Sequence, residues 1–174
     1  YLLALVPFGE NDPAILAAAW SALTAAEPMK RSAAVRLLSA YRPAQDWVRP
    51  LLNDPVRLVR LDAEWMLSSE LPKDSPTRKE LDAYLALTLD QPSGRLRLGQ
   101  DLANRGQLAE AEKEIALAVK WEPYSGGIHE ALGMVLAGLG RSLEAAAELE
   151  RAGELPPSDA PSAMRAGLAY AEAG

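Results

Sequence analysis

The residue types that most often perform chemistry are scarce in this chain of 174 residues. It has one histidine, His129, and no cysteine. The lack of cysteine excludes disulfides, thiolate metal sites, a cysteine nucleophile and covalently attached haem within these residues. As a general base, His129 would need a positioned acid or nucleophile, and no known motif places one beside it. We predict that His129 packs against a neighbouring helix and that the chain holds no catalytic site and no metal.

Carboxylates and glycines are two further candidate groups. Paired carboxylates can perform acid–base chemistry, but those of the C-terminal half are spaced as on the solvated face of helices: Glu110, Glu112, Glu114, Glu144, Glu148 and Glu150. The segment Gly138-Leu139-Gly140-Arg141 lacks the preceding strand and the Gly-Lys-Ser/Thr ending of a phosphate-binding loop. We therefore predict no enzyme activity and no bound cofactor.

Tryptophans could form an aromatic cage for a ligand if several of them converged around a polar complement. The four tryptophans are Trp20, Trp47, Trp65 and Trp121. The first three lie at helical core spacing, and Trp121 comes near the end of a predicted helix. We predict that all four pack in the core.

Charge and apolar runs exclude two classes of partner. The formal net charge of −6 argues against a nucleic-acid groove, which needs a basic surface. The longest apolar runs, residues 1–8 and 14–20, are far shorter than the roughly 20 residues of a membrane span. Residues 1–8 are expected to be the end of a helix that begins earlier. The sequence does not fix the compartment.

A 34-residue repeat organises the C-terminal half. Its key residues keep their type at this offset: Leu98-Gly99, Gly106, Ala111, Ala118 and Pro123 recur as Leu132-Gly133, Gly140, Ala145, Ala152 and Pro157. The pattern predicts two antiparallel helices per repeat. A glycine permits close approach within the first helix, and a second glycine ends that helix in a left-handed conformation. Alanines keep the second helix close, and a proline stops it.

These residues resemble the tetratricopeptide repeat (TPR) family, whose pattern in each repeat is W-x2-L-G-x2-Y, then A-x3-F, then P. The matching positions are Leu98-Gly99-x2-Leu102, Ala111-x3-Ile115 and Pro123, and then Leu132-Gly133-x2-Leu136, Ala145-x3-Leu149 and Pro157. Aliphatic residues replace the aromatic ones, and Arg95 and His129 occupy the tryptophan position. The resemblance implies an all-α superhelix of antiparallel helix pairs, with repeats over 92–125 and 126–159 and a truncated one over 160–174.

Residues 1–75 are similar to HEAT repeats. The sequence DPVRLVRLDAEWML, which starts at Asp54 and Pro55, resembles the second helix of such a repeat, with Asp54 as its predicted cap. A weaker copy lies upstream at an offset of 29, where Arg31, Ala34, Leu38 and Ser39 align with Arg60, Ala63, Leu67 and Ser68.

A bridging segment over 76–91 joins the two halves, with Ser75 as its predicted cap and an apolar stripe of Leu81, Leu85 and Leu89. We expect one continuous solenoid. Its predicted helices lie near 12–26, 28–40, 43–52, 55–70, 76–90, 93–105, 108–121, 127–139, 142–155 and 161–173.

The TPR resemblance implies a peptide groove along the first helices of the repeats. The family's groove positions give Leu96, Arg97, Gln100, Asn104, Glu130, Met134, Met164, Arg165 and Leu168. Most residues of the family's carboxylate clamp are absent, and methionine suits varied apolar partners. We therefore expect an apolar or helical protein segment in this groove.

Several alternatives stay open at this point. The favoured interpretation is a non-enzymatic module for protein–protein interaction or scaffolding. The second is an accessory structural domain of a longer parent protein, because bacterial proteins with this HEAT-then-TPR order include multihaem cytochromes. The resemblance leaves the compartment open between the bacterial cytoplasm and the periplasm. Self-association through the truncated last repeat is the third. The sequence does not identify the partner, the oligomeric state, the number of repeats or what lies beyond residues 1 and 174.

Overall fold

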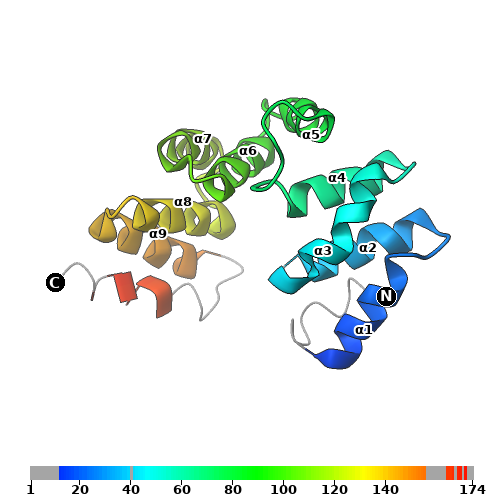
Figure 1. Ribbon diagram of the computed structural model, residues 1–174. Helices are drawn as coiled ribbons and strands as arrows, with labels where there is room; N and C mark the ends of the chain where they lie inside the picture. Colours follow the sequence, from blue (N-terminus) through cyan, green and yellow to red (C-terminus); the bar gives the residue numbers. More distant parts are fainter. Residues whose placement is uncertain (1–11, 40, 156–163, 167, 170, 172–174) are drawn as a thin grey trace. The chain divides into compact units, whose positions relative to one another are not determined.

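The computed structural model describes residues 12–39, 41–155, 164–166, 168, 169 and 171. Every regular element in these residues is helical (Figure 1), which confirms the predicted all-α class. The elements are α1 (Pro13–Ala22), α2 (Pro28–Leu38), η2 (Arg42–Ala44), α3 (Gln45–Val48), η3 (Arg49–Asn53), α4 (Arg57–Met66), α5 (Pro76–Ala86), α6 (Pro92–Asn104), α7 (Leu108–Trp121), α8 (Gly126–Gly138) and α9 (Ser142–Glu154).

Two compact units make up the chain, Tyr1–Ala83 and Tyr84–Gly174, which we call the N-terminal and C-terminal units. The division falls inside α5, within the predicted bridging segment 76–91. On the predicted apolar stripe, Leu81 and Leu85 are buried and Leu89 is half-buried. The expected domain limits at 75 and 92 stay a prediction, as does a continuous solenoid.

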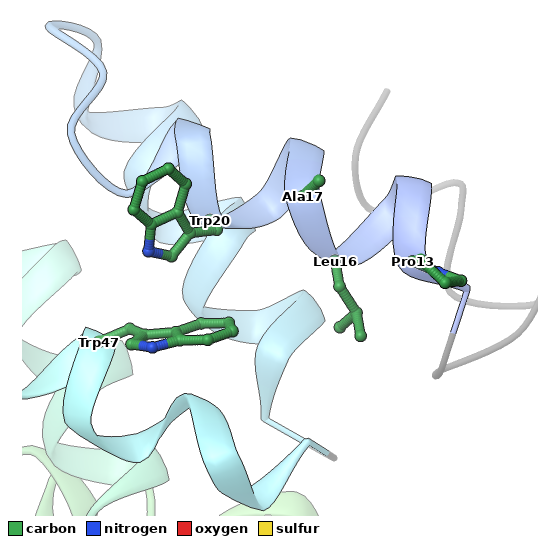
Figure 2. Close-up of a pocket in the computed structure, with 5 residues that line it drawn as sticks. All are labelled: Pro13, Leu16, Ala17, Trp20 and Trp47. Carbon is green, nitrogen blue, oxygen red and sulfur yellow. The ribbon is translucent and has the colours of Figure 1, made fainter.

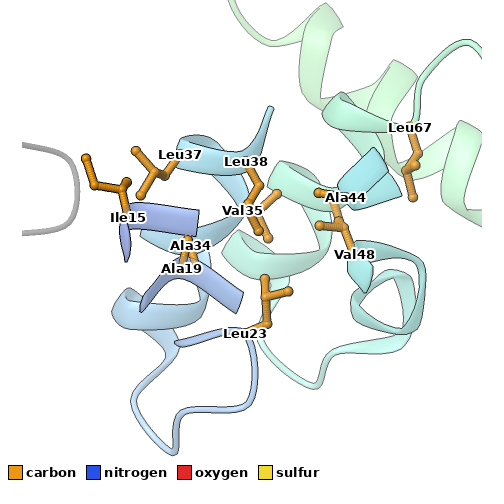
Figure 3. Packing of buried hydrophobic residues seen from close by; sticks show 11 residues of the cluster. Ile15, Ala19, Leu23, Ala34, Val35, Leu37, Leu38, Ala44, Val48 and Leu67 are labelled. Carbon is orange, nitrogen blue, oxygen red and sulfur yellow. The ribbon is translucent and has the colours of Figure 1, made fainter. Parts of the chain in front are cut away.

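The core of the N-terminal unit lies where α1, α2 and α4 meet. Helix α2 packs against both α1 and α4. Aliphatic side chains and alanines interlock there (Figure 3), from these helices, the residues that directly follow α1 and α4, and η2 and α3: Ile15, Ala19, Leu23, Ala34, Val35, Leu37, Leu38, Ala44, Val48, Ala63 and Leu67. The small alanines allow the helix axes to approach closely.

Residues 43–52 do not form the single helix that the sequence predicts. They are divided among η2, α3 and η3, and α3 has only four residues. Pro43 and Pro50 explain the breaks, because proline lacks the N–H that continues a helix and its ring clashes with the preceding turn. Val48 nevertheless reaches the core and is fully buried.

The two predicted caps have different outcomes. Ser75 caps α5 as predicted, because its Oγ accepts a 3.1 Å hydrogen bond from the backbone N–H of Arg78. Asp54 does not cap α4, which begins later than predicted, at Arg57. Asp54 instead accepts the N–H of Val56 at 2.8 Å in a local turn and receives two bonds from Arg31.

The C-terminal unit stacks helix pairs as the 34-residue repeat predicts. Helix α6 packs against α7, α7 against α8, and α8 against α9. Their shared core is built from small and aliphatic side chains: Ala111, Ile115, Ala118, Ile128, Leu132, Val135, Leu136 and Ala145. A smaller cluster joins Ala146 and Leu149 of α9 to Ala166 and Ala169 of the last repeat. Residues 1–11 and 156–163 lie outside the described part, so the expected helix end at 1–8 and Pro157 are not placed.

The repeated glycines occupy the positions that the sequence predicts. A Cβ on Gly133 would lie 2.7 Å from Leu149 Cγ, and one on Gly99 would overlap Ile115, so both permit close approach between paired helices. Gly106 and Gly140, which follow the first helices, have φ of 75° and 76°. Only glycine adopts this left-handed conformation without strain.

Candidate binding surfaces

One polar link is repeated within the helix pairs of the C-terminal unit. Arg95 on α6 donates to Glu114 on α7 at 2.7 Å. One repeat later, His129 Nδ1 on α8 lies 2.6 Å from Glu148 Oε2 on α9. Each link ties the first helix of a repeat to the second.

His129 is buried, as predicted, but it has a partner that no sequence motif indicated. Besides Glu148 on Nδ1, its Nε2 lies 3.0 Å from the carbonyl oxygen of Pro123, so Nε2 is the donor of that bond. Both ring nitrogens are therefore occupied by the protein itself. With no free nitrogen, His129 does not act as a general base in this arrangement. The signal for this pair was its spacing along the chain, which equals that of Arg95 and Glu114 in the preceding repeat.

The predicted groove residues of α6 do not all face solvent. Leu96 packs against the core of the C-terminal unit, and Gln100 is half-buried. Arg97 is exposed and donates to the hydroxyl of Tyr84 at 3.1 Å. Asn104 is exposed at the end of the helix. The predicted groove residues on α6 are thus mainly polar.

The predicted groove residues of α8 and the last repeat form a more apolar surface. Met134, Met164 and Leu168 are 58%, 65% and 59% exposed, and we call them the methionine patch. Glu130 on α8 forms an ion pair with Arg165, which brings these two segments side by side. Met134 lies one helical turn after Glu130 and Leu168 about one turn after Arg165, so the apolar residues continue the same two faces.

The tryptophan prediction was wrong for three of the four residues. Trp20, Trp47 and Trp121 are 57%, 38% and 43% exposed. Trp65 is half-buried. Trp121 lies beneath the guanidinium group of Arg95, which is 5.5 Å from its ring centroid, so a cation–π contact replaces core packing there.

An open apolar pocket of about 530 Å³ lies on the N-terminal unit (Figure 2). It is lined by Pro13, Leu16, Ala17 and Trp20 of α1 and by Trp47 of α3. The two indoles lie on opposite sides of it, and the ring centroid of Trp47 is also 6.0 Å from that of Tyr41. All five lining side chains are uncharged.

The predicted offset of 29 has a structural counterpart in the N-terminal unit. Arg31 donates through Nη1 to the carbonyls of Ala25 and Ala26, at 2.7 and 3.0 Å. Arg60 donates in the same way to the carbonyls of Asp54 and Pro55, at 2.8 and 3.3 Å. The remaining guanidinium nitrogens of each arginine bind one carboxylate, that of Asp54 for Arg31 and that of Glu80 for Arg60.

These arginines set the electrostatics of their partners. Hydrogen bonding to the Arg31 guanidinium holds the pKa of Asp54 below its usual value. The Arg60 guanidinium does the same to the pKa of Glu80. Glu64 on α4 is the opposite case, because burial and the nearby charge of Glu80 raise its pKa to about 7.

Among the described residues, no three metal-ligating side chains lie together so that they could hold a metal ion. None of the helices among these residues has both the length and the apolar character that crossing a membrane requires.

The comparisons with known proteins concern the fold alone. The chain is similar to the crystal structure of a thermophilic TPR protein of Thermus thermophilus, with a TM-score of 0.59 and 20% sequence identity. The match covers 91% of this chain and 90% of that one. No family model and no curated protein matches the sequence. The HEAT and multihaem cytochrome resemblances stay predictions, and the fold of the chain is that of a TPR-like protein made of packed helix pairs.

Proposed function

We propose that this chain is a protein-binding module that holds an apolar peptide or helix on the first helices of its C-terminal unit. The observation that carries the proposal is the methionine patch. Three large apolar side chains, Met134, Met164 and Leu168, are each more than half exposed and lie on neighbouring helical segments. Keeping such side chains in water is unfavourable unless a partner covers them.

The chemistry of the surface favours an apolar occupant over a charged one. Glu130 and Arg165 neutralise each other across the two segments, so neither needs a charged ligand. Methionine side chains are flexible and polarisable, and they adapt to apolar partners of different shapes. The net charge of −6 disfavours nucleic acid as the partner. The exposed Arg97 and Asn104 on α6 would supply polar contacts beside the patch.

The test uses peptides selected from a displayed random library for binding to the chain. The affinity of an enriched, labelled peptide is then measured by fluorescence anisotropy with the double variant Met134→Ala/Leu168→Ala. We expect enrichment in apolar residues and a loss of affinity of at least about fivefold, corresponding to about 1 kcal/mol. The matched control is Met29→Ala, because Met29 is 68% exposed on α2 in the other unit.

Equal affinity for the double variant and the parent, with unchanged circular dichroism, would show that the patch is not the binding surface. A larger loss with Met29→Ala would move the site to the N-terminal unit.

A second function, as an accessory domain within a longer protein, is favoured by one observation. The apolar pocket lined by Trp20 and Trp47 belongs to the N-terminal unit, whereas the predicted TPR groove residues belong to the C-terminal unit. In that case a neighbouring region of the same protein would cover the pocket. Protection of Trp20 from iodide quenching in the longer protein, but not in residues 1–174 alone, would support it.

A further inference from the structure

Glu64 is a buried carboxyl group without an ordinary partner. Its side chain on α4 is fully shielded from solvent, and neither carboxylate oxygen receives a hydrogen bond. Burying an ionised carboxylate without donors is strongly unfavourable. Its neighbours therefore decide whether this group carries a proton.

Charged groups approach Glu64 from its own helix and from the elements packed on it. Glu80 on α5 and Arg57 and Arg60 on α4 are the groups whose charges act on it. Other charged side chains of α2, of α4 and of the turn before α4 have partners of opposite charge. These are Arg31 and Arg36 on α2, Asp62 on α4 and Asp54 in the turn before α4. On α5, Arg78 is paired with Asp82.

Glu80 connects α5 to α4. Its carboxylate accepts bonds from Arg60 at 2.8 and 2.9 Å and a longer one from Arg57 at 3.3 Å. A protonated Glu64 adds a further bond, because its O–H can donate to the Glu80 carboxylate. An ionised Glu64 cannot donate, and it places a second negative charge beside Glu80.

We propose that Glu64 is a proton-dependent latch: its protonated carboxyl group strengthens the hold of α4 on α5 beside the Arg60–Glu80 bonds, and loss of that proton loosens α5 from α4. The loosening follows from solvation. An ionised Glu64 gains hydrogen bonds only by reaching water, and it reaches water on the side where α5 carries Glu80. Helix α5 also contains the division between the two units. The latch therefore acts on the segment that joins them.

The raised pKa of Glu64, about 7, sets the pH range of this effect. We call the state with α5 held on α4 closed and the other open. A group whose pKa is higher in the closed state favours closing at low pH, and this advantage is lost as the pH rises towards 7. With an ordinary pKa of about 4.5 in the open state, the opening equilibrium should rise about tenfold between pH 6 and pH 8.

Hydrogen exchange measured by mass spectrometry on the whole chain tests the latch. We expect the protection of amides in α5, corrected for the intrinsic effect of pH, to fall about tenfold between pH 6 and pH 8. Glu64→Gln cannot ionise and keeps a donor for Glu80, so its α5 should keep at pH 8 the protection that the parent has at pH 6. Glu110→Gln, on the exposed side of α7, is the matched control and should behave as the parent.

A direct titration of the parent protein tests the proposal even if Glu64→Gln does not fold. The side-chain carboxyl resonance of Glu64, assigned by its disappearance in Glu64→Gln, should titrate near pH 7 in carbon-13 spectra. A midpoint near 4.5 would overturn the proposal. The same would follow if α5 lost protection equally in the parent and in Glu64→Gln, or if protection in the parent did not change with pH.

Discussion

The two units join their helices by different means. The N-terminal unit connects α2, α4 and α5 with arginine–carboxylate bonds, in which Asp54 binds the Arg31 guanidinium and Glu80 binds the Arg60 guanidinium in two bonds each. The C-terminal unit adds glycine to the alanines that both units place between helices, as at Gly133 against Leu149. Its repeated polar links, such as His129 with Glu148, add to contacts that small residues already make possible. We therefore expect the stability of the N-terminal unit to depend on pH and that of the C-terminal unit to depend on side-chain volume.

The largest effect should come from Glu64. Replacing it with Gln removes an ionisable group whose pKa is about 7 in the folded unit and about 4.5 when unfolded. The raised pKa means that the parent loses stability as the pH rises from about 4.5 to 7. Glu64→Gln should therefore raise the unfolding free energy of the N-terminal unit at pH 8 by up to about 3 kcal/mol. Urea unfolding at pH 8 and pH 4 checks this, with no gain expected at pH 4.

The next effect concerns the arginine–carboxylate bonds. Asp54→Ala removes the two carboxylate oxygens that accept hydrogen bonds from Arg31. The side chains of Asp54 and Arg31 are largely buried, so we expect the unfolding free energy to fall by about 2 kcal/mol at pH 7. The lowered pKa of Asp54 means that this contribution is present above pH 4 and is lost at lower pH, as Asp54 becomes protonated. The control in the C-terminal unit is Glu144→Gln, which breaks an exposed pair with Arg141.

Exposed pairs contribute little. Glu144→Gln should leave thermal unfolding unchanged. An equal loss from both substitutions would mean that the two units do not differ in how far they depend on ion pairs.

A smaller effect is expected within α8, where the stability of the C-terminal unit should depend on side-chain volume. Gly133→Ala should cost about 1 kcal/mol, because the new methyl group is forced against Leu149 and this outweighs the better helix propensity of alanine. Gly127→Ala in the same helix meets no atom within 4 Å and should stabilise the unit slightly. Thermal unfolding of the two variants side by side gives the sign of each change. A gain from both would contradict the close approach at Gly133.

The smallest effect is expected for a tryptophan. A buried tryptophan typically costs about 3 to 5 kcal/mol when replaced by alanine. Because Trp20 is 57% exposed, Trp20→Ala should cost less than about 1 kcal/mol in chemical unfolding. A large loss would show that Trp20 supports the core, as its spacing in the sequence predicted.

The parts of the fold that could be predicted are those where one residue type reports the backbone geometry. Gly106 and Gly140 indicated a left-handed conformation, and Gly99 and Gly133 indicated close approach, because other residues are excluded from such places. The offset of 34 then placed the ends of α6, α7, α8 and α9 close to where the structure has them. The similarity to the TPR structure agrees with this interpretation of the repeat.

The parts that could not be predicted depend on which face of a helix meets the core. Trp20 lies in an almost wholly apolar helix, so spacing alone could not distinguish its exposed side from the buried side of Ala19. The burial of Glu64 was also missed, because a glutamate in a helix is expected to face solvent. Among the groove residues, no pattern indicated that Leu96 packs inward or that Glu130 and Arg165 pair with each other.

The central claim, that the methionine patch is the protein-binding surface, is tested most directly by photo-crosslinking. A photoreactive amino acid is placed at Met134 on α8 and, in a second protein, at Leu143 on α9, which is 65% exposed and similarly apolar. We expect the selected peptide to become attached from position 134 and not from position 143. Attachment from position 143 with none from position 134 would contradict it.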